Sequence, residues 1–490
     1  MTDALHGLLD EAAAAAPDRP AVVTDERHWT YRELATRTHT AAAWLAAHGV
    51  RRGDRVVLLA ANGPDLVCAC YAVSRLGAAF VVVSAETKPF QLRHILDNAG
   101  PALVLTDDPA RVPADVTVPV ATFPALDQES GTSVEWPGIS TDPACLIYTS
   151  GSTAAPKGVV SPHRTMRFAV AAIAGRLGLR PGDVIGTFLP LSFDYGLYQV
   201  FLAAHARATL ALGDPGQVGP GLPRRLERWG VTVLPLVPSI ATALLRLHRR
   251  GGAPLPALRA VTNTGARLAP ETIDLLRQAF PDVAVYAMFG LTECKRVAIL
   301  DPADLDRRRG SVGRPLPDTE CLIVDEDGRP LPPGATGELV VRGPHVMAGY
   351  WRAPEQTAQR FRPYGAGTEL ALFTGDLCAL DEDGYLYFRG RFDDVYKSRG
   401  HRVSTLEVEA AALDVPGVAE AAVVPPHHDG DPVRLFVTGT ADAGTVLAGL
   451  RERLEPAKVP DTVRVLDRMP LSTNRKIDRH QLRDEAPEVT

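Results

Sequence analysis

The stretch "YTSGSTAAPKGVV", residues 148–160, combines hydroxyl side chains with glycines and one lysine after an apolar run. Hydroxyls, backbone amides and an ammonium group together suit a polyanion such as a triphosphate. The spacing is not that of a Walker loop, because Gly151 is followed by five residues and Lys157, with Gly158 in place of Ser or Thr. Pro156 disfavours a helix at the residue before it. We therefore expect a loop that holds phosphate without a helix N-terminus; a polar surface turn is the alternative.

Apolar β-like runs alternate with helical patterns over most of the first 300 residues. The run "RVVLLA" (55–60) precedes a helical segment that starts near Pro64 and stops near Gly77. Two series of this kind, the second beginning with "CLIYTS" (145–150), predict α/β structure with parallel sheets covered on both faces. We expect two doubly wound α/β subdomains, at about residues 1–180 and 181–305.

The pattern changes after about residue 310. Residues that favour turns are frequent between the apolar runs of "CLIVDEDGRPLPPGATGELVVRG" (321–343). This pattern predicts a β-rich subdomain over about 306–392. A small α+β segment follows, with Glu407 and Glu409 in its helical "TLEVEAAALDV" (405–415). We therefore expect a large N-terminal domain, residues 1–392, and a small mobile C-terminal domain, residues 393–490, with a hinge at Asp393.

Charge and composition exclude several classes of protein. The net charge is −6 without long charged runs, so neither nucleic acid nor a membrane surface is an expected partner. The N-terminus lacks the features of a secretory signal, and no apolar run approaches about 18 residues. Six cysteines without C-x-x-C spacing predict buried free thiols rather than a metal site, in a cytoplasmic protein.

Lysine is scarce among the 52 basic residues of the chain. The six lysines are Lys88, Lys157, Lys295, Lys397, Lys458 and Lys476. We expect a chain that uses arginine elsewhere to keep a lysine where a compact point charge is required. Chance retention is the alternative explanation for any single lysine.

Four more polar segments follow the opening stretch along the chain. They are "MFGLTECKRV" (288–297), "FTGDL" (373–377), "FRGRFDDVYKSRG" (388–400) and "LSTNRKIDR" (471–479). In this order, the five segments resemble the adenylate-forming superfamily of acyl-CoA ligases, luciferases and the adenylation enzymes of nonribosomal peptide synthesis. The resemblance covers about residues 20–480. It implies that a carboxylate reacts with ATP to give an acyl-adenylate and pyrophosphate, with Mg²⁺ present, and that the acyl group then passes to a thiol.

The resemblance also implies which residues bind ATP and the metal ion. Those around the phosphates are Thr149, Ser150, Gly151, Ser152, Thr153 and Lys157. Those around the base and ribose are Gly265, Ala266, Phe289, Asp376 and Arg391. Glu293 matches a magnesium ligand, which suits a hard carboxylate, and Thr292 is implied to reach the α-phosphate. Ala154 replaces a usual glycine and removes no ligand group.

Lys476 is the residue that the resemblance implies for adenylation. A mobile ammonium can bridge the substrate carboxylate and the α-phosphate and so reduce their repulsion. Arg475 stands where glycine is usual, and either adds charge there or points to solvent. Rotation about Asp393 is implied to withdraw Lys476 and to present a second face, including Lys397 and Gly400, to the thiol.

The segment "LPLSFDYGLYQVF" (189–201) indicates the substrate. By resemblance, Asp194 after Phe193 matches an aspartate that amino-acid-activating relatives carry. A buried ammonium needs such a partner, because an unpaired buried charge costs several kcal/mol. We therefore expect an α- or β-amino acid; a helix N-cap is the alternative role for Asp194.

Arg296 matches a position that lines the substrate pocket in those relatives. A second carboxylate on an aspartate-like substrate would explain a guanidinium there. Alternatively, Lys295 and Arg296 pair with "DPADLD" (301–306) or face solvent. The rest of the pocket wall is expected to comprise Tyr195, Tyr198, Thr264, Met288, Gly290 and Val297.

The thiol acceptor is indicated by two segments that disagree. The ending "NRKIDR" (474–479) resembles peptide-synthetase adenylation enzymes, whereas "LGAAFVVVSAETKPFQLRHIL" (76–96) resembles CoA ligases. We expect a free-standing enzyme that loads the phosphopantetheine arm of a separate carrier protein. The alternatives are an acyl- or aryl-CoA ligase and, more remotely, a non-catalytic nucleotide-binding protein of the same fold.

Overall fold

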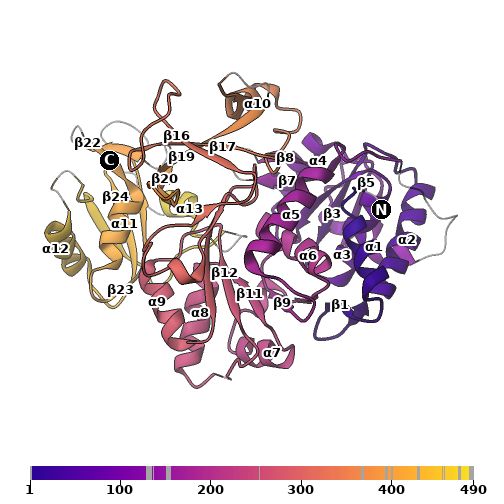
Figure 1. Ribbon diagram of the computed structural model, residues 1–490, viewed down its shortest axis with the longest axis horizontal. Coiled ribbons are helices and arrows are strands. Elements are labelled where there is room, and N and C mark those ends of the chain that lie inside the picture. The colour runs from indigo at the N-terminus through magenta and orange to yellow at the C-terminus, as the bar shows by residue number, and fades with distance from the viewer. Residues whose placement is uncertain are drawn as a thin grey trace. The chain divides into compact units, whose positions relative to one another are not determined.

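The structure is a computed structural model of the chain (Figure 1). It describes residues 3–127, 135, 137–149, 156–252, 254–365, 369–391, 395–398, 401–426, 431–454, 456, 458–472 and 476–484. Two compact units are present. The large unit comprises Met1–Glu320 and Val341–Phe373, and the small unit comprises Cys321–Val340 and Thr374–Thr490. The proposed hinge at Asp393 lies outside the described residues and stays a prediction.

A six-stranded sheet in the large unit carries the opening stretch. Its order is β6 (Val120–Thr122), β5 (Leu103–Thr106), β3 (Arg55–Ala60), β4 (Ala79–Ser84), β7 (Pro143–Thr149) and β8 (Lys157–Pro162). The pairs up to β7 are parallel, whereas β8 runs antiparallel to β7 and places Thr149 opposite Lys157. The phosphate stretch therefore leads into a strand and not into a helix, as Pro156 predicted.

A nine-stranded sheet forms the second layer of the large unit. Its order is β15 (Arg314–Pro315), β14 (Ala298–Ile299), β13 (Ala284–Phe289), β12 (Ala260–Asn263), β11 (Val233–Leu236), β9 (Val184–Thr187), β10 (Thr209–Leu212), β1 (Pro20–Val23) and β2 (His28–Thr30). Strand β1 pairs with β10, so residues 20–30 join this sheet although we expected residues 1–180 in the first subdomain. A short apolar strand fits the edge of either sheet, and its pattern does not select one.

The remaining strands form three smaller sheets. One contains β16 (Glu320–Val324), β17 (Thr336–Arg342), β18 (Phe361–Pro363), β19 (Leu370–Leu380) and β20 (Leu386–Arg391). The others are β21 (Val395–Ser398) with β22 (His401–Ser404), and β23 (Val418–Val424), β24 (Arg434–Gly439) and β25 (Thr462–Val465). The β19–β20 pair is antiparallel.

The helices cover these sheets (Figure 1). In the large unit they are α1 (Gly7–Ala15), α2 (Tyr31–Ala47), α3 (Pro64–Arg75), α4 (Pro89–Ala99), α5 (His163–Leu177), α6 (Asp194–Ala206), α7 (Leu222–Arg228), α8 (Pro238–Arg249), α9 (Pro270–Ala279) and α10 (Pro354–Arg360). In the small unit they are α11 (Thr405–Leu413), α12 (Ala443–Arg453) and α13 (Arg479–Asp484). Pro64 occupies the first turn of α3, as expected, and helix α6 packs against α1 and α5.

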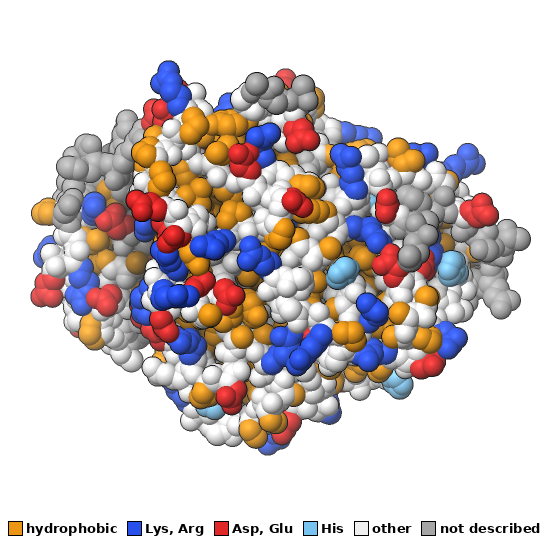
Figure 2. Space-filling model, viewed as in Figure 1, with side chains coloured by type: hydrophobic (Ala, Val, Ile, Leu, Met, Phe, Trp, Pro, Cys, Tyr) orange, Lys and Arg blue, Asp and Glu red, His pale blue; other side chains and the backbone are white. Residues whose placement is uncertain are grey.

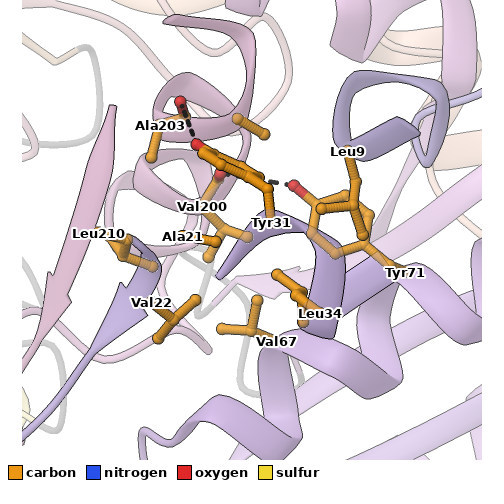
Figure 3. Close-up of a pocket in the computed structure, with 11 residues that line it drawn as sticks. Leu9, Ala21, Val22, Tyr31, Leu34, Val67, Tyr71, Val200, Ala203 and Leu210 are labelled. Carbon is orange, nitrogen blue, oxygen red and sulfur yellow. Dashed lines mark hydrogen bonds between the residues drawn. The ribbon is translucent and has the colours of Figure 1, made fainter. Parts of the chain in front are cut away.

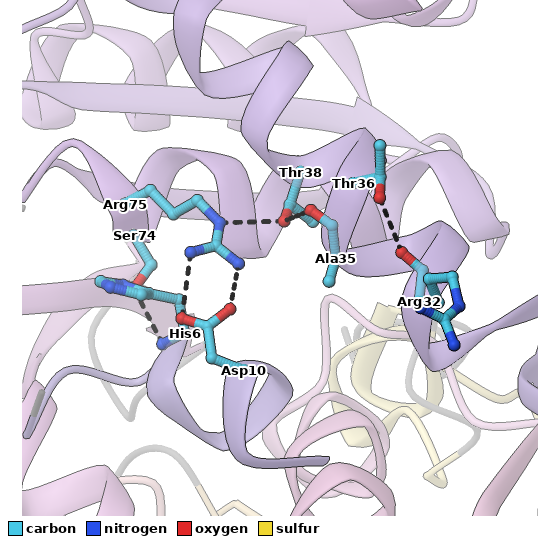
Figure 4. A network of polar contacts seen from close by, with 8 residues as sticks. All are labelled: His6, Asp10, Arg32, Ala35, Thr36, Thr38, Ser74 and Arg75. Carbon is cyan, nitrogen blue, oxygen red and sulfur yellow. Dashed lines mark hydrogen bonds and ion pairs between the residues drawn. The ribbon is translucent and has the colours of Figure 1, made fainter. Parts of the chain in front are cut away.

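A polar network holds α1 against α2 and α3 (Figure 4). The guanidinium of Arg75, which is 4% exposed, donates to both carboxylate oxygens of Asp10 and to the hydroxyl of Thr38. His6 bonds to Ser74 through its backbone N–H and through Nδ1. The carboxylate and the hydroxyl together accept three hydrogen bonds from this guanidinium, which offsets part of the cost of burying its charge.

An apolar cavity lies between the same helices and α6 (Figure 3). Its lining residues are Leu9, Ala21, Val22, Tyr31, Leu34, Val67, Tyr71, Val200, Ala203, Ala204 and Leu210. The Tyr31 hydroxyl is already satisfied, since it donates to the carbonyl oxygens of Ala203 at 2.9 Å and Ala208 at 2.6 Å. Such a lining lacks the converging polar groups of a substrate site, so the cavity belongs to the core.

Acid is expected to destabilise the large unit through three buried histidines. Burial lowers the pKa of His6 to about 3 and those of His163 and His345 to about 4. All three are neutral in the folded state at a pH where the unfolded chain is protonated, so stability present above about pH 6.5 is lost as the pH falls towards 4. Near pH 5 the free energy of unfolding should fall by about 4 kcal/mol per pH unit, about 1.4 for each proton. Urea unfolding at stepped pH measures this slope, and a His345→Gln variant should reduce it by about a third.

On the face shown in Figure 2, basic and acidic side chains are interspersed. Within the described residues, no helix is long and apolar enough to cross a membrane, and no three His, Cys, Asp or Glu side chains are grouped to hold a metal. All six cysteines are free thiols; five of them are buried and Cys321 is half-buried.

Candidate active site

The chain turns back on itself directly after β13. Val297 donates its backbone N–H to the carbonyl of Phe289 at 2.8 Å, which closes the turn. Gly290 is required there, because a Cβ at this position would lie 2.0 Å from the carbonyl oxygen of Lys295. Lys295 itself has a φ of +58°, in the left-handed region. This backbone directs the side chains of Lys295 and Arg296 into the protein.

The two cations are buried under the aromatic residues of α6. Lys295 is 3% exposed and Arg296 is 5% exposed. The ammonium lies 4.8 Å from the centre of the Tyr198 ring, and the guanidinium carbon lies 5.3 Å from the centre of the Tyr195 ring. Neither Lys295 Nζ nor Arg296 Nε has a hydrogen-bond partner among the described residues. Cation–π contacts therefore hold two charges, of which the Lys295 ammonium and one guanidinium nitrogen of Arg296 lack a hydrogen bond within the described residues.

The alternative that these cations pair with residues 301–306 or face solvent is wrong. Asp306 forms its ion pair with Arg277, and Asp304 forms its ion pair with Arg307. Burial also lowers the pKa values of Lys295 and Arg296 below their ordinary ranges. Two desolvated cations on one turn are costly without an anionic partner.

Asp194 is a carboxylate whose negative charge acts on both of these cations. It is half-buried at the first position of α6, and its carboxylate has no hydrogen bond or ion pair within the described part of the chain. The N-cap is Phe193, so the alternative of an Asp194 cap is wrong. Although burial dominates, the Asp194 charge partly offsets the lowered pKa values of Lys295 and Arg296. An anion and two cations therefore share one interior region.

The rest of the expected wall surrounds this region. Tyr195 shares a 2.6 Å hydrogen bond with the hydroxyl of Thr262, whereas the hydroxyls of Tyr198 and Thr264 have no partner among the described residues. Buried apolar wall residues are Met288 and Val297. Gly265 and Ala266 follow β12, and Phe289 ends β13, so the residues expected near the base lie at the carboxyl ends of neighbouring strands. Ligands of open α/β sheets bind at this edge.

Tyr350 links the phosphate side to Glu293, and we did not predict it from the sequence. Its hydroxyl donates to Glu293 Oε1 at 2.7 Å, and Lys157 Nζ lies 5.4 Å from the centre of its ring. Segment 348–351 lies alongside β8 and forms backbone hydrogen bonds with it, including Trp351 N–H to the Gly158 carbonyl at 2.8 Å. The only sequence feature that could have indicated this role is the tyrosine of "AGYW" (348–351). A contact between residues that are 57 positions apart leaves no local pattern. The predicted ligands Ser150, Gly151, Ser152 and Thr153 lie outside the described residues.

The donors at Glu293 fit Mg²⁺. A half-buried carboxylate beside a phenol hydroxyl offers hard oxygen atoms, and Thr292 precedes it on the same turn. With no larger acidic cluster in the described residues, an ion here would complete its shell with phosphate oxygens and water, as Mg²⁺ prefers.

Removing the Tyr350 hydroxyl is expected to weaken metal-dependent ATP binding. A Tyr350→Phe variant keeps the ring near Lys157 but loses one hydrogen bond to a charged group, worth about 1.5–3 kcal/mol. The Mg²⁺ concentration for half-maximal ATP binding, measured by calorimetry, should rise about ten- to a hundredfold. Tyr387→Phe, which removes a hydroxyl bonded to Asp381 in the small unit, should leave it unchanged.

The small unit holds the remaining predicted residues. Asp376 is 2% exposed and lies opposite Arg391 in the β19–β20 ladder, with Arg391 Nε 3.3 Å from Asp376 Oδ1. Such a carboxylate suits two ribose hydroxyls. Lys476 is half-buried and donates its backbone N–H to Ser472 Oγ at 3.3 Å. Gly400 lies outside the described residues, as does the side chain of Lys397 on β21.

Two protein-family models match the chain. The AMP-binding enzyme model covers residues 9–351, and the model of the AMP-binding enzyme C-terminal domain covers residues 407–476. The chain belongs to the AMP-binding enzyme family. Its members are adenylate-forming enzymes of the acid–thiol ligase type that use ATP and Mg²⁺, so the predicted family, fold, enzyme class and cofactors are confirmed.

The family relatives include both CoA ligases and peptide synthetases. The chain is 35% identical over 433 residues to 4-coumarate–CoA ligase-like 4 of Oryza sativa subsp. japonica, which covers 81% of this chain and 76% of that ligase. It is also 35% identical over 508 residues to the isonitrile lipopeptide synthase of Streptomyces coeruleorubidus, across 99% of this chain but 33% of the synthase. The chain thus spans a third of that synthase, and the whole synthase's activity is not transferred to it.

Solved structures of the family resemble the chain over most of its length. The complex of VinN with L-aspartate is 39% identical, with a TM-score of 0.72, over 79% of this chain and 98% of VinN. The Bacillus subtilis O-succinylbenzoate CoA synthetase with ATP and magnesium is 28% identical, with a TM-score of 0.87, over 97% and 99% of the two chains.

Proposed function

We propose that this AMP-binding enzyme activates an aspartate-like amino acid as its aminoacyl-adenylate and passes it to the phosphopantetheine thiol of a carrier protein. One observation carries the substrate assignment: two buried cations, Lys295 and Arg296, lie near a carboxylate, Asp194, that has no ion-pair partner within the described residues. The charges of these three side chains are complementary to those of an amino dicarboxylate, which carries one ammonium group and two carboxylates.

The charges can be matched group by group. Asp194 would take the substrate ammonium, Lys295 and Arg296 would take the second carboxylate, and the first carboxylate would remain free to react. A fatty or aryl acid would leave both cations without an anion, which costs several kcal/mol. VinN, whose solved complex contains L-aspartate, is a relative consistent with this match. The site chemistry fits α- and β-amino dicarboxylates alike.

The proposed mechanism uses the chain's own charges to bring two anions together. Lys157 and the loop before it would bind the β- and γ-phosphates, and Glu293 with Tyr350 would hold Mg²⁺. The ion would neutralise phosphate charge when bound. Asp376, with Arg391 beside it, would orient the ribose, and Thr292 would contact the α-phosphate. Lys476 would neutralise the attacking carboxylate and the α-phosphate in the transition state.

The acceptor is proposed from one motif and from the peptide-synthetase relatives. The "NRKIDR" segment resembles peptide-synthetase enzymes, and peptide-synthetase relatives align over 97–99% of this chain. The second candidate is CoA, which the likeness to a plant CoA ligase-like protein and to O-succinylbenzoate CoA synthetase favours. Transfer of the activated acid to a pantetheinylated carrier protein, but not to CoA, would support the first acceptor; the reverse result would support the second.

Pyrophosphate exchange across a panel of acids tests the substrate class. The panel contains L-aspartate, a β-amino dicarboxylate, L-leucine, benzoate and decanoate. We expect exchange with an amino dicarboxylate and background rates with benzoate and decanoate. Exchange confined to benzoate or decanoate would identify an acyl- or aryl-CoA ligase, and ATP binding without any exchange would identify a catalytically silent protein.

A further inference from the structure

Glu409 of α11 forms a buried polar link within the small unit. It is 7% exposed, and its Oε1 lies 2.7 Å from a guanidinium nitrogen of Arg479. Arg479 begins α13, three residues after Lys476. The ion pair therefore ties helix α11 to the segment that carries the lysine assigned to adenylation.

The pair closes the free edge of the three-stranded sheet in the small unit. Strand β23 is an edge strand, with β24 on its other side. Val423 donates its N–H to Glu409 Oε1 at 2.7 Å, and its carbonyl accepts from Arg479 Nε at 3.3 Å. Both backbone groups of Val423 point away from β24, because the N–H and C=O of one strand residue face the same side. The two side chains thus replace a neighbouring strand.

The same pair joins the two layers that cover this sheet. Side chains of a strand alternate between its faces. Val423 packs with Val408 of α11 in one hydrophobic cluster, whereas Val424 packs with Leu482 of α13 in another. Helices α11 and α13 therefore lie on opposite faces of the sheet, and the Glu409–Arg479 contact passes around its edge to link them.

The backbone of Lys476 is held by a hairpin next to this link. Ser472 donates its N–H to the Lys476 carbonyl at 2.7 Å, and Asp478 donates to the Pro470 carbonyl at 2.9 Å. Ile477 packs against the cluster of Leu482. Because two residues separate Lys476 from Arg479, the position of Arg479 sets the position of the lysine backbone.

We propose that Glu409 and Arg479 are positioning residues for adenylation, and that they act by fixing Lys476 relative to the small unit. The proposal rests on the role proposed for Lys476. A cation that bridges two anions in a transition state must be placed closely, since a 1 Å displacement can cost about a hundredfold in rate. A lysine on a hairpin without this anchor would bridge the two anions less often.

The chain offers a matched control on the same helix. Glu407 of α11 pairs with Lys458 at 2.8 Å, but this pair has no link to the hairpin of Lys476 among the described contacts. The variants are Glu409→Gln, which keeps an acceptor for Val423 but loses the charge, Arg479→Met and Arg479→Lys. Lys458→Met is the control that removes a comparable ion pair.

Hydrogen exchange measured by mass spectrometry tests the positioning without any substrate. In Glu409→Gln and Arg479→Met, amides of residues 470–484 should exchange at least tenfold faster than in the wild type, whereas Lys458→Met should leave them unchanged. Unchanged protection in both test variants would overturn the proposal, and this result does not depend on the proposed substrate or on the role of Lys476.

Separating the two half-reactions tests the catalytic consequence. With ATP and the most active acid of the panel, kcat for pyrophosphate exchange should fall ten- to a hundredfold, with KM for ATP within twofold, and Arg479→Lys should recover part of the loss. Transfer from synthetic aminoacyl-adenylate to pantetheine should stay within twofold. Equal loss in both half-reactions, or faster hydrogen exchange with normal kcat, would overturn the proposal. A wild-type rate of pyrophosphate exchange in Lys476→Ala would instead show that the assigned role of Lys476 is wrong.

Discussion

Replacing Lys476 with alanine is expected to reduce acid-dependent pyrophosphate exchange by at least a hundredfold while ATP still binds. The attacking carboxylate and the α-phosphate are both anionic, and the charge that neutralises them acts mainly in the transition state. Removing one hydrogen-bond donor that stabilises charge in a transition state costs about 2.7–4 kcal/mol, or about 10²- to 10³-fold in rate, and we expect at least as much for a full charge. Exchange of labelled pyrophosphate at saturating ATP measures the rate, and calorimetry measures ATP affinity, which should change less than threefold.

A matched lysine controls for the loss of a positive charge from the chain. Lys88 is exposed in the large unit, and the Lys88→Ala variant should catalyse pyrophosphate exchange at the wild-type rate. The role of Lys476 would be contradicted if its alanine variant kept the wild-type rate, or if the loss of rate followed entirely from weaker ATP binding.

Replacing Asp194 with alanine is expected to cost about 2–4 kcal/mol in amino-acid activation. The substrate ammonium would then lie in the protein beside Lys295 and Arg296 without its carboxylate partner. At about 1.4 kcal/mol per tenfold change, kcat/KM for the amino acid should fall roughly 30- to 1,000-fold. Exchange kinetics with varied amino acid measure this effect, and KM for ATP should stay within threefold.

The isosteric variant separates charge from packing at this position. Asp194→Asn keeps the shape and the start of α6, so it should lose nearly as much activity as Asp194→Ala if the negative charge recognises the ammonium. Normal activation by both variants would show that Asp194 has only a structural role in the first turn of the helix.

Much of the large unit could be predicted because local signals agreed with the tertiary structure. Pro64 in the first turn of α3 and Gly77 in the left-handed conformation just after this helix show the expected boundary chemistry. The membership of β1 in the nine-stranded sheet could not be predicted, since pairing between Val22 and Leu210 joins segments almost 190 residues apart. Periodicity indicates a strand, but it does not identify the partner of that strand.

The residues of the candidate site also fall into two groups: those that local sequence could predict and those that it could not. Asp194 and Arg296 were found because motif positions identify them one by one. The inward direction of Lys295 was left open, because it depends on a positive φ in a turn closed around Gly290. Tyr350 and the Glu409–Arg479 pair act through contacts between distant segments, so neither leaves a pattern in the local sequence.

The pyrophosphate exchange rates with L-aspartate and L-asparagine test the central claim most directly, because the two acids differ mainly in the second carboxylate. If Lys295 and Arg296 recognise that carboxylate, kcat/KM for aspartate should exceed that for asparagine at least a hundredfold, and Arg296→Leu should reduce this ratio at least tenfold. Equal values for the two acids in the wild type, or a ratio unchanged by Arg296→Leu, would contradict the account.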